Sequence, residues 1–164
     1  MKRKCFYSFH YQPDVTRVAK LRNIGAVEGN RPATDNGWES VKKGGDTAIK
    51  RWIAKEMKGK SCAIVMVCAN TANRKWINHE IIEAWKTGMG VVGIHIHGIS
   101  DIRGNLTSAG NNPFDYIKYG NYRKLSSVVK CYNPSGWTSK DRYAWISKNL
   151  VAMAEEAIKI RKEN

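Results

Sequence analysis

The stretch Ser61-Cys-Ala-Ile-Val-Met-Val-Cys-Ala69 decides the fold class of this chain. It is almost continuously apolar and too short for a core helix, which is typical of a strand that is covered on both faces. A helix is predicted directly after it, over residues 73–88. A buried strand that leads into a helix predicts an α/β domain with a central, mainly parallel sheet.

Strands and helices alternate along the rest of the chain. The predicted strands cover residues 2–9, 61–69, 91–97 and 127–132, with a short one near 24–27. The predicted helices cover residues 13–22, 46–57 and 73–88, and a terminal segment that follows Thr138. Thr138 and Asp141 have the spacing of a capping box, and Asp46 is predicted to cap the helix that runs to Met57. Long loops are expected over 25–45 and 97–121, with a structured turn at 112–115 before a short helix.

The composition favours one folded domain over residues 1–164. A chain of 164 residues with 42% hydrophobic content is long enough for one core and short for two. Its longest apolar run falls far short of a membrane span, and its first residues do not resemble a signal peptide. We therefore expect a soluble, cytoplasmic protein.

The net charge of +14 suggests a nucleic-acid-binding module as one hypothesis, because clustered basic side chains bind phosphates. The distribution of the charge argues against it. Basic residues exceed acidic ones over 1–60 and 118–164, whereas 61–117 holds four of each. Without a recognisable nucleic-acid-binding motif, the excess is interpreted as a solvated basic surface, which would also concentrate small phosphorylated anions.

Metal binding is not predicted from the cysteines or histidines. The cysteines show no CxxC spacing and are interpreted as reduced core thiols: Cys5, Cys62, Cys68 and Cys131. His95 and His97 alternate onto one face of a strand, but no third ligand is identifiable.

A carboxylate, Glu80, interrupts the apolar face of the helix at 73–88. At helical spacing it shares an arc with the following side chains: Trp76, Ile77, Ile81, Ala84 and Trp85. Burying an unpaired charge is costly, so Glu80 either meets a buried partner such as Ser8 or a backbone amide, or lines a cleft that uses its carboxylate. The residues alone leave both interpretations open.

Other polar residues are predicted to lie near Glu80. In parallel sheets, ligands bind beyond the carboxyl ends of the strands. The first strand would deliver Ser8, Phe9 and His10 to that edge, the strand at 61–69 would deliver Asn70, and the next would deliver His97. We therefore expect residues that are distant in sequence to converge on one cleft.

Several segments resemble one known family. Trp76-Ile-Asn-His-Glu80 resembles the WxxxE segment of TIR domains, and Phe6-Tyr-Ser-Phe-His10 resembles their first-strand motif. Ile94-His-Ile-His97, Gly104-Asn105 and the segment at 110–117 are similar to the small bacterial TIR-like family that contains the Thoeris antiphage protein ThsB.

The resemblance implies a flavodoxin-like, three-layer TIR fold that cleaves NAD at its N-glycosidic bond and releases nicotinamide. It implies that Glu80 is catalytic and that NAD is the substrate, without a further cofactor. It also implies a cyclic ADP-ribose-type product that activates a separate effector in antiphage defence. The segment at 29–37 lies where TIR domains carry an assembly loop, so a homo-oligomer is a further hypothesis.

The supporting residues have alternative interpretations. Trp76 is expected mainly to pack in the core, and Ser8, Phe9 and His10 either end a strand or line the substrate pocket, with Phe9 stacking on a ring. Asn70 and Trp76 complete the predicted substrate-binding set. The rival to the enzyme is a non-catalytic TIR-like adaptor that acts through homotypic contacts, with Glu80 purely structural.

Overall fold

The computed structural model describes residues 2–29 and 40–164. Its main sheet has five parallel strands in the order β2-β1-β3-β4-β7. The strands are β1 (Lys4–Ser8), β2 (Glu28–Gly29), β3 (Cys62–Val67), β4 (Gly90–His95) and β7 (Cys131–Tyr132). This order reverses direction between β1 and β3, as in flavodoxin-like folds, and confirms the predicted α/β class.

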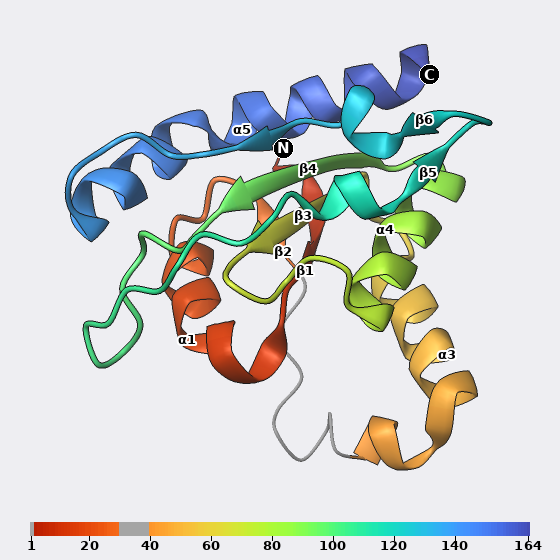
Figure 1. Cartoon of the computed structure of the whole chain (residues 1–164), viewed down its shortest axis with the longest axis horizontal. Helices are drawn as coiled ribbons and strands as arrows, with labels where there is room; N and C mark the ends of the chain where they lie inside the picture. Colours follow the sequence, from red (N-terminus) through yellow and green to blue (C-terminus); the bar gives the residue numbers. More distant parts are fainter. Residues whose placement is uncertain (1, 30–39) are drawn as a thin grey trace.

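Helices cover both faces of this sheet, which makes three layers (Figure 1). The helices are α1 (Tyr11–Arg22), α3 (Gly45–Met57), α4 (Lys75–Lys86) and α5 (Ser139–Glu163). α1 and α5 pack on one face, and α3 and α4 pack on the other. Every residue of β3 is buried, because this strand lies in the middle of the sheet with both faces covered.

The longest helix, α5, runs along β4 (Figure 1). Its start follows the predicted capping box: the Thr138 hydroxyl accepts from the Asp141 amide at 3.1 Å, and the Asp141 carboxylate accepts from the Thr138 amide at 3.3 Å. Gly90 permits the close packing, since a Cβ built there would lie 2.6 Å from the Ile158 nitrogen. The helix therefore begins as the sequence predicts and rests directly on the strand backbone.

Smaller elements differ from the sequence-based expectations. The predicted strand at 127–132 is wrong for its first half, because η2 (Leu125–Ser127) is a 3-10 turn. The short strand near 24–27 forms at Glu28–Gly29 instead. The loop at 25–45 includes helical residues 40–43, and residues 30–39, with most of the assembly segment at 29–37, lie outside the described residues.

The segment between β4 and β7 contains more structure than a loop. Asn112 accepts from the Phe114 amide at 2.9 Å and caps η1 (Pro113–Tyr116), which confirms the structured turn. β5 (Lys118–Tyr119) and β6 (Arg123–Lys124) then form an antiparallel hairpin.

The prediction that Asp46 caps a helix is wrong. Gly44 occupies the N-cap of α3, and the Asp46 carboxylate in the first turn instead accepts from Lys75 Nζ at 2.5 Å. The lysine comes from α4, so the two helices on this face of the sheet are joined by a surface ion pair that sequence spacing could not show.

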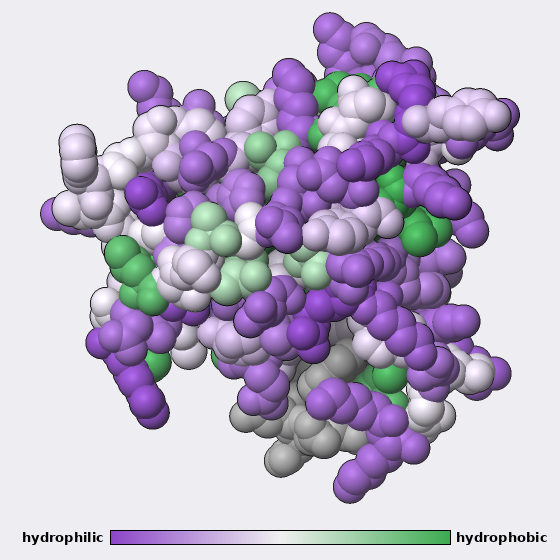
Figure 2. Space-filling view, viewed as in Figure 1, coloured by the Kyte–Doolittle hydropathy of each residue, from purple (hydrophilic) through white to green (hydrophobic). Residues whose placement is uncertain are grey.

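The surface is rich in hydrophilic side chains. Figure 2 shows them spread over the visible face, with apolar residues scattered among them. Within residues 2–29 and 40–164, no helix is long and apolar enough to cross a membrane.

Candidate functional site

Glu80 lies where the apolar face of α4 meets the carboxyl edge of the sheet. Ile77, Ile81 and Ala84 of the same helix are buried, and Glu80 itself is half-buried. Desolvation raises the pKa of its carboxyl to about 8, and the nearby Ser8 hydroxyl counteracts part of that rise. The prediction that Glu80 lies on the apolar face is confirmed, and its carboxyl can change charge near neutral pH.

Ser8 is the last residue of β1 and is almost fully buried. Alternation along β1 places it on the same face as Phe6, which packs with α4. Within the described part of the chain its Oγ makes no hydrogen bond of normal geometry, yet the hydroxyl lies near enough to Glu80 to lower the pKa of that carboxyl. The strand and the helix thus bring these two predicted site residues together.

Phe9 and His10 form the connection from β1 to α1. The Phe9 ring packs against the core on the α1 side and stacks with Tyr11, with 5.9 Å between ring centroids. His10 is the N-cap of α1, and its Nδ1 is buried without a hydrogen-bond partner among the described residues. Desolvation, with a smaller contribution from Arg74, lowers the pKa of His10, so its ring is neutral near pH 7.

Trp76 has the packing role that its spacing predicts. It is half-buried against the core beneath α3 and α4. Lys75 Nζ lies 4.9 Å from its ring centroid, and the His79 ring meets it edge-on at 5.5 Å between centroids. Its direct contact with substrate stays a prediction.

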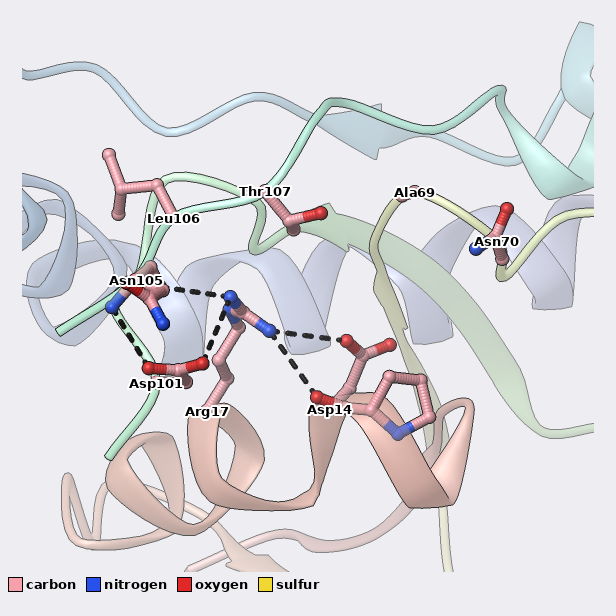
Figure 3. A pocket seen from close by; sticks show the side chains of 9 residues that line it. Asp14, Arg17, Ala69, Asn70, Asp101, Asn105, Leu106 and Thr107 are labelled. Carbon is pink, nitrogen blue, oxygen red and sulfur yellow. Dashed lines mark hydrogen bonds and ion pairs between the residues drawn. The ribbon is translucent and has the colours of Figure 1, made fainter. Parts of the chain in front are cut away.

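Asn70 lies in a pocket of about 280 Å³ on the α1 side of the sheet edge (Figure 3). The first turns of α1, the loop after β3 and the loop after β4 form its walls. Glu80, Ser8 and Trp76 do not line it. The predicted residues therefore fall into two neighbouring places at the sheet edge rather than into one cleft.

His95 and His97 share one side of the sheet at the end of β4. Their ring centroids lie 5.8 Å apart, and each Nδ1 is buried without a hydrogen-bond partner among the residues the structure describes. Desolvation lowers the pKa of both side chains. Over the described ranges, no group of three or more His, Cys, Asp and Glu is arranged to hold a metal ion.

Sequence reasoning missed Arg74, Asp14 and Arg17. Arg74 is the N-cap of α4 and lies near His10, which adds a positive charge to this edge. Asp14 and Arg17 are both buried in α1. With Val18 and Leu21 they occupy positions i, i+3, i+4 and i+7, so the spacing argument that singled out Glu80 would have found them too.

Known proteins resemble this chain over most of its length. Residues 6–101 match the family described as "Thoeris protein ThsB, TIR-like domain". A protein of Bacillus cereus (strain MSX-D12), named "Putative cyclic ADP-D-ribose synthase ThsB1", is 37% identical over 143 residues, which covers 84% of this chain and 72% of that protein. The residues matched to the family include the end of β1 and all of β3, α4 and β4, and hence Ser8 and Glu80. The chain therefore belongs to the Thoeris ThsB family of TIR-like domains.

Proposed function

We propose that this protein cleaves the N-glycosidic bond of NAD, releases nicotinamide and forms a cyclic ADP-ribose-type product. The observation that carries the proposal is the Glu80 carboxyl, held beside Ser8 at the switch point of the sheet with a pKa near 8. The name of the Bacillus cereus relative supports the same reaction class.

The bond to be broken joins a cationic pyridinium nitrogen to C1′ of ribose. When it breaks, the electron pair stays on nicotinamide, which leaves as a neutral molecule and needs no general acid. Positive charge develops on the ribose, and a carboxylate beside the ring stabilises that charge. A single carboxylate, that of Glu80, is therefore sufficient for cleavage of this bond.

Glu80 must be ionised to act in this way. Its raised pKa leaves much of the free protein protonated at neutral pH. The cationic nicotinamide end of NAD favours the charged carboxylate, because an opposite charge nearby lowers the pKa of an acid. Substrate binding and ionisation of Glu80 thus support each other, and the proton departs to solvent.

Polar and charged groups at the same edge of the sheet suit the rest of the substrate. Neutral His10 can donate or accept a hydrogen bond with a ribose or phosphate oxygen, and Arg74 lies near it with a positive charge. Ser8 and Phe9 are proposed to contact the nicotinamide ribose and a ring of the substrate. No electrons are transferred overall, so the proposed reaction calls for no redox cofactor.

The fate of the ribosyl cation decides the product. Water would give ADP-ribose, whereas a hydroxyl or base nitrogen of the same molecule would close a ring. Exclusion of water favours closure. We propose that the cyclic product activates a separate effector in antiphage defence, and that a homo-oligomer completes the active assembly.

The test is incubation of concentrated protein with NAD, followed by chromatography and mass spectrometry. Wild type should release nicotinamide, and Glu80→Gln should lose turnover while it remains folded. A product that equals NAD minus nicotinamide marks cyclisation, and one added water marks hydrolysis. Glu83→Gln, a change on the same helix, serves as the matched control and should keep activity.

Two results would count against the enzyme. Turnover that persists in Glu80→Gln would show that Glu80 is not the catalytic carboxylate. Absence of turnover in wild type, even in crowded solution with a lysate of phage-infected cells, together with partner binding that Glu80→Gln preserves, would support the adaptor hypothesis.

A further inference from the structure

We infer that the pocket between α1 and the loop after β4 binds the vicinal diol of a nucleoside ribose, with Asp14 as its acceptor. The pocket is lined by Pro13, Asp14, Ala69, Asn70, Leu106 and Thr107, among others. Its 280 Å³ is at the small end for ligand sites and suits part of a nucleotide. The choice of a nucleoside over another polyol rests on the proposed function.

Asp14 is a buried carboxylate that faces this space. It is only 3% exposed, and desolvation raises its pKa. Its ion pair with Arg17 is long, with 3.5 Å between Oδ1 and Nη1. In Figure 3 the carboxylate, the Thr107 hydroxyl and the Asn70 amide border one space. Burial deprives the Asp14 carboxylate of hydrogen bonds from water. A ligand that donates hydrogen bonds to Asp14 would replace them.

The other charged groups of the pocket are already engaged. Arg17 donates from Nε to the Ile99 carbonyl at 2.9 Å and from Nη2 to the Asn105 carbonyl at 2.9 Å. The Asp101 Oδ1 accepts from the Arg103 and Asn105 amides, both at 2.9 Å. Asp14 pairs with Arg17 and takes a hydrogen bond from the Cys68 thiol, but a carboxylate can accept further hydrogen bonds and so can still meet a ligand.

The charge of the pocket excludes a phosphate. Two carboxylates, Asp14 and Asp101, face one guanidinium, Arg17, whose distances to them are 3.5 and 3.8 Å. The net charge of these three side chains is negative, and the guanidinium already donates hydrogen bonds to backbone carbonyls. A neutral diol that both donates and accepts hydrogen bonds matches a carboxylate, an amide and a hydroxyl together.

Apolar groups at the pocket wall suit the base of the same nucleoside. Pro13 from α1 and Leu106 from the loop after β4 both line the pocket, and Leu106 is 56% exposed. A ring placed between them would cover apolar surface that the protein leaves in water. The same Asp14 would reject a ribose that carries a 2′-phosphate, so the pocket would select NAD-type over NADP-type adenosine.

The binding test uses the intact protein and adenosine, measured by calorimetry or ligand-observed NMR. Wild type should bind adenosine, while 2′-deoxyadenosine and 3′-deoxyadenosine should each bind at least about tenfold more weakly. Adenosine 2′-monophosphate should not bind. These comparisons leave the protein unchanged, so they do not depend on whether a variant folds.

Variants of the pocket residues then test which side chains contact adenosine. Asp14→Asn should weaken adenosine by about tenfold or more, and Thr107→Val should weaken it by a smaller factor. Glu163→Gln, at the exposed end of α5, is the matched charge control and should bind as wild type does. Equal binding of adenosine and its deoxy analogues, unchanged binding by a folded Asp14→Asn, or no adenosine binding at millimolar concentration would overturn the site.

Glu80→Gln separates the two sources of the ribose. If the diol belongs to the adenosine half of the NAD cleaved at Glu80, adenosine should compete with NAD on this variant, and Asp14→Asn should raise KM more than it changes kcat. If it belongs to a free nucleoside, both ligands should bind at once. Adenosine binding without NAD cleavage by wild type would refute the proposed function and leave this site intact.

Discussion

Arg17 and Asp14 form a buried ion pair one turn apart on α1, with Nη1 of the arginine 3.5 Å from Oδ1 of the aspartate. The arginine also joins α1 to the chain after β4, because its guanidinium donates to the carbonyls of Pro13, Ile99 and Asn105. One side chain thus holds the wall of a pocket and offsets part of the negative charge inside it. Loss of the hydrogen bonds and loss of the charge should therefore lower the free energy of unfolding by different amounts.

Replacement of Arg17 should separate these two roles. Arg17→Lys keeps the charge beside Asp14 but loses the planar fork that reaches three carbonyls, so unfolding free energy should fall by about 1–3 kcal/mol. Arg17→Met also leaves Asp14 buried without its cation and should cost about 3–5 kcal/mol. Urea unfolding measures both values.

Arg3 offers the control for this comparison. Its ion pair with Glu155 is on the surface, with side chains 45% and 47% exposed. Arg3→Lys should hardly move the urea midpoint, because water already solvates both partners. A loss as large as that of Arg17→Lys would contradict the tethering role of the buried arginine.

The rate of NAD cleavage should depend on the charge of Glu80. If ionised Glu80 acts on the substrate, kcat/KM should rise about tenfold per pH unit below about 8 and level off above it. The apparent pKa in kcat should be lower, because bound NAD carries a positive charge near the carboxylate. A pH profile from steady-state kinetics, without an inflection between pH 6 and about 9, would argue against this assignment.

Glu80 should also make the fold less stable as pH rises. The folded-state pKa of about 8 lies above the usual 4.5, so between these values the folded protein binds more protons than the unfolded chain. The free energy of unfolding therefore falls through this window as pH increases. Glu80→Gln removes the effect and should raise Tm at pH 8.

The gain in Tm that Glu80→Gln gives should increase with pH. At a pH below the usual 4.5 both forms of the chain hold the proton, and Glu80→Gln should melt close to wild type. Glu83→Gln on the same helix is the control for loss of a negative charge. A Tm gain for Glu80→Gln that is equal at low and high pH would show that the cause is packing rather than ionisation.

The capping box of α5 should contribute a measurable part of the stability. Thr138→Ala removes the acceptor for the Asp141 amide and should lower the unfolding free energy by about 1 kcal/mol. Thr138→Ser retains the hydroxyl and should stay close to wild type. Chemical denaturation of the three proteins tests this, and equal loss in both variants would point to the threonine methyl group instead.

Local patterns were sufficient for the main elements of this fold. The apolar run of β3, the helical spacing of α4 and the capping box of α5 each depend on neighbours in sequence, and the structure has all three. The prediction that Asp46 caps its helix is wrong for the complementary reason. Its partner is Lys75 on another helix, so the pattern of its own helix could not reveal it.

The sequence by itself determined the α/β class, the family and the inward position of Glu80, because periodicity and motifs act within a few residues. The tertiary structure alone decided which groups meet. Strand order placed Ser8 beside Glu80, and the close approach of α1 to the chain after β4 gave Asn70 a separate pocket with Asp14. Desolvation sums over all surrounding atoms, so the pKa of Glu80 becomes defined only when the whole chain has folded.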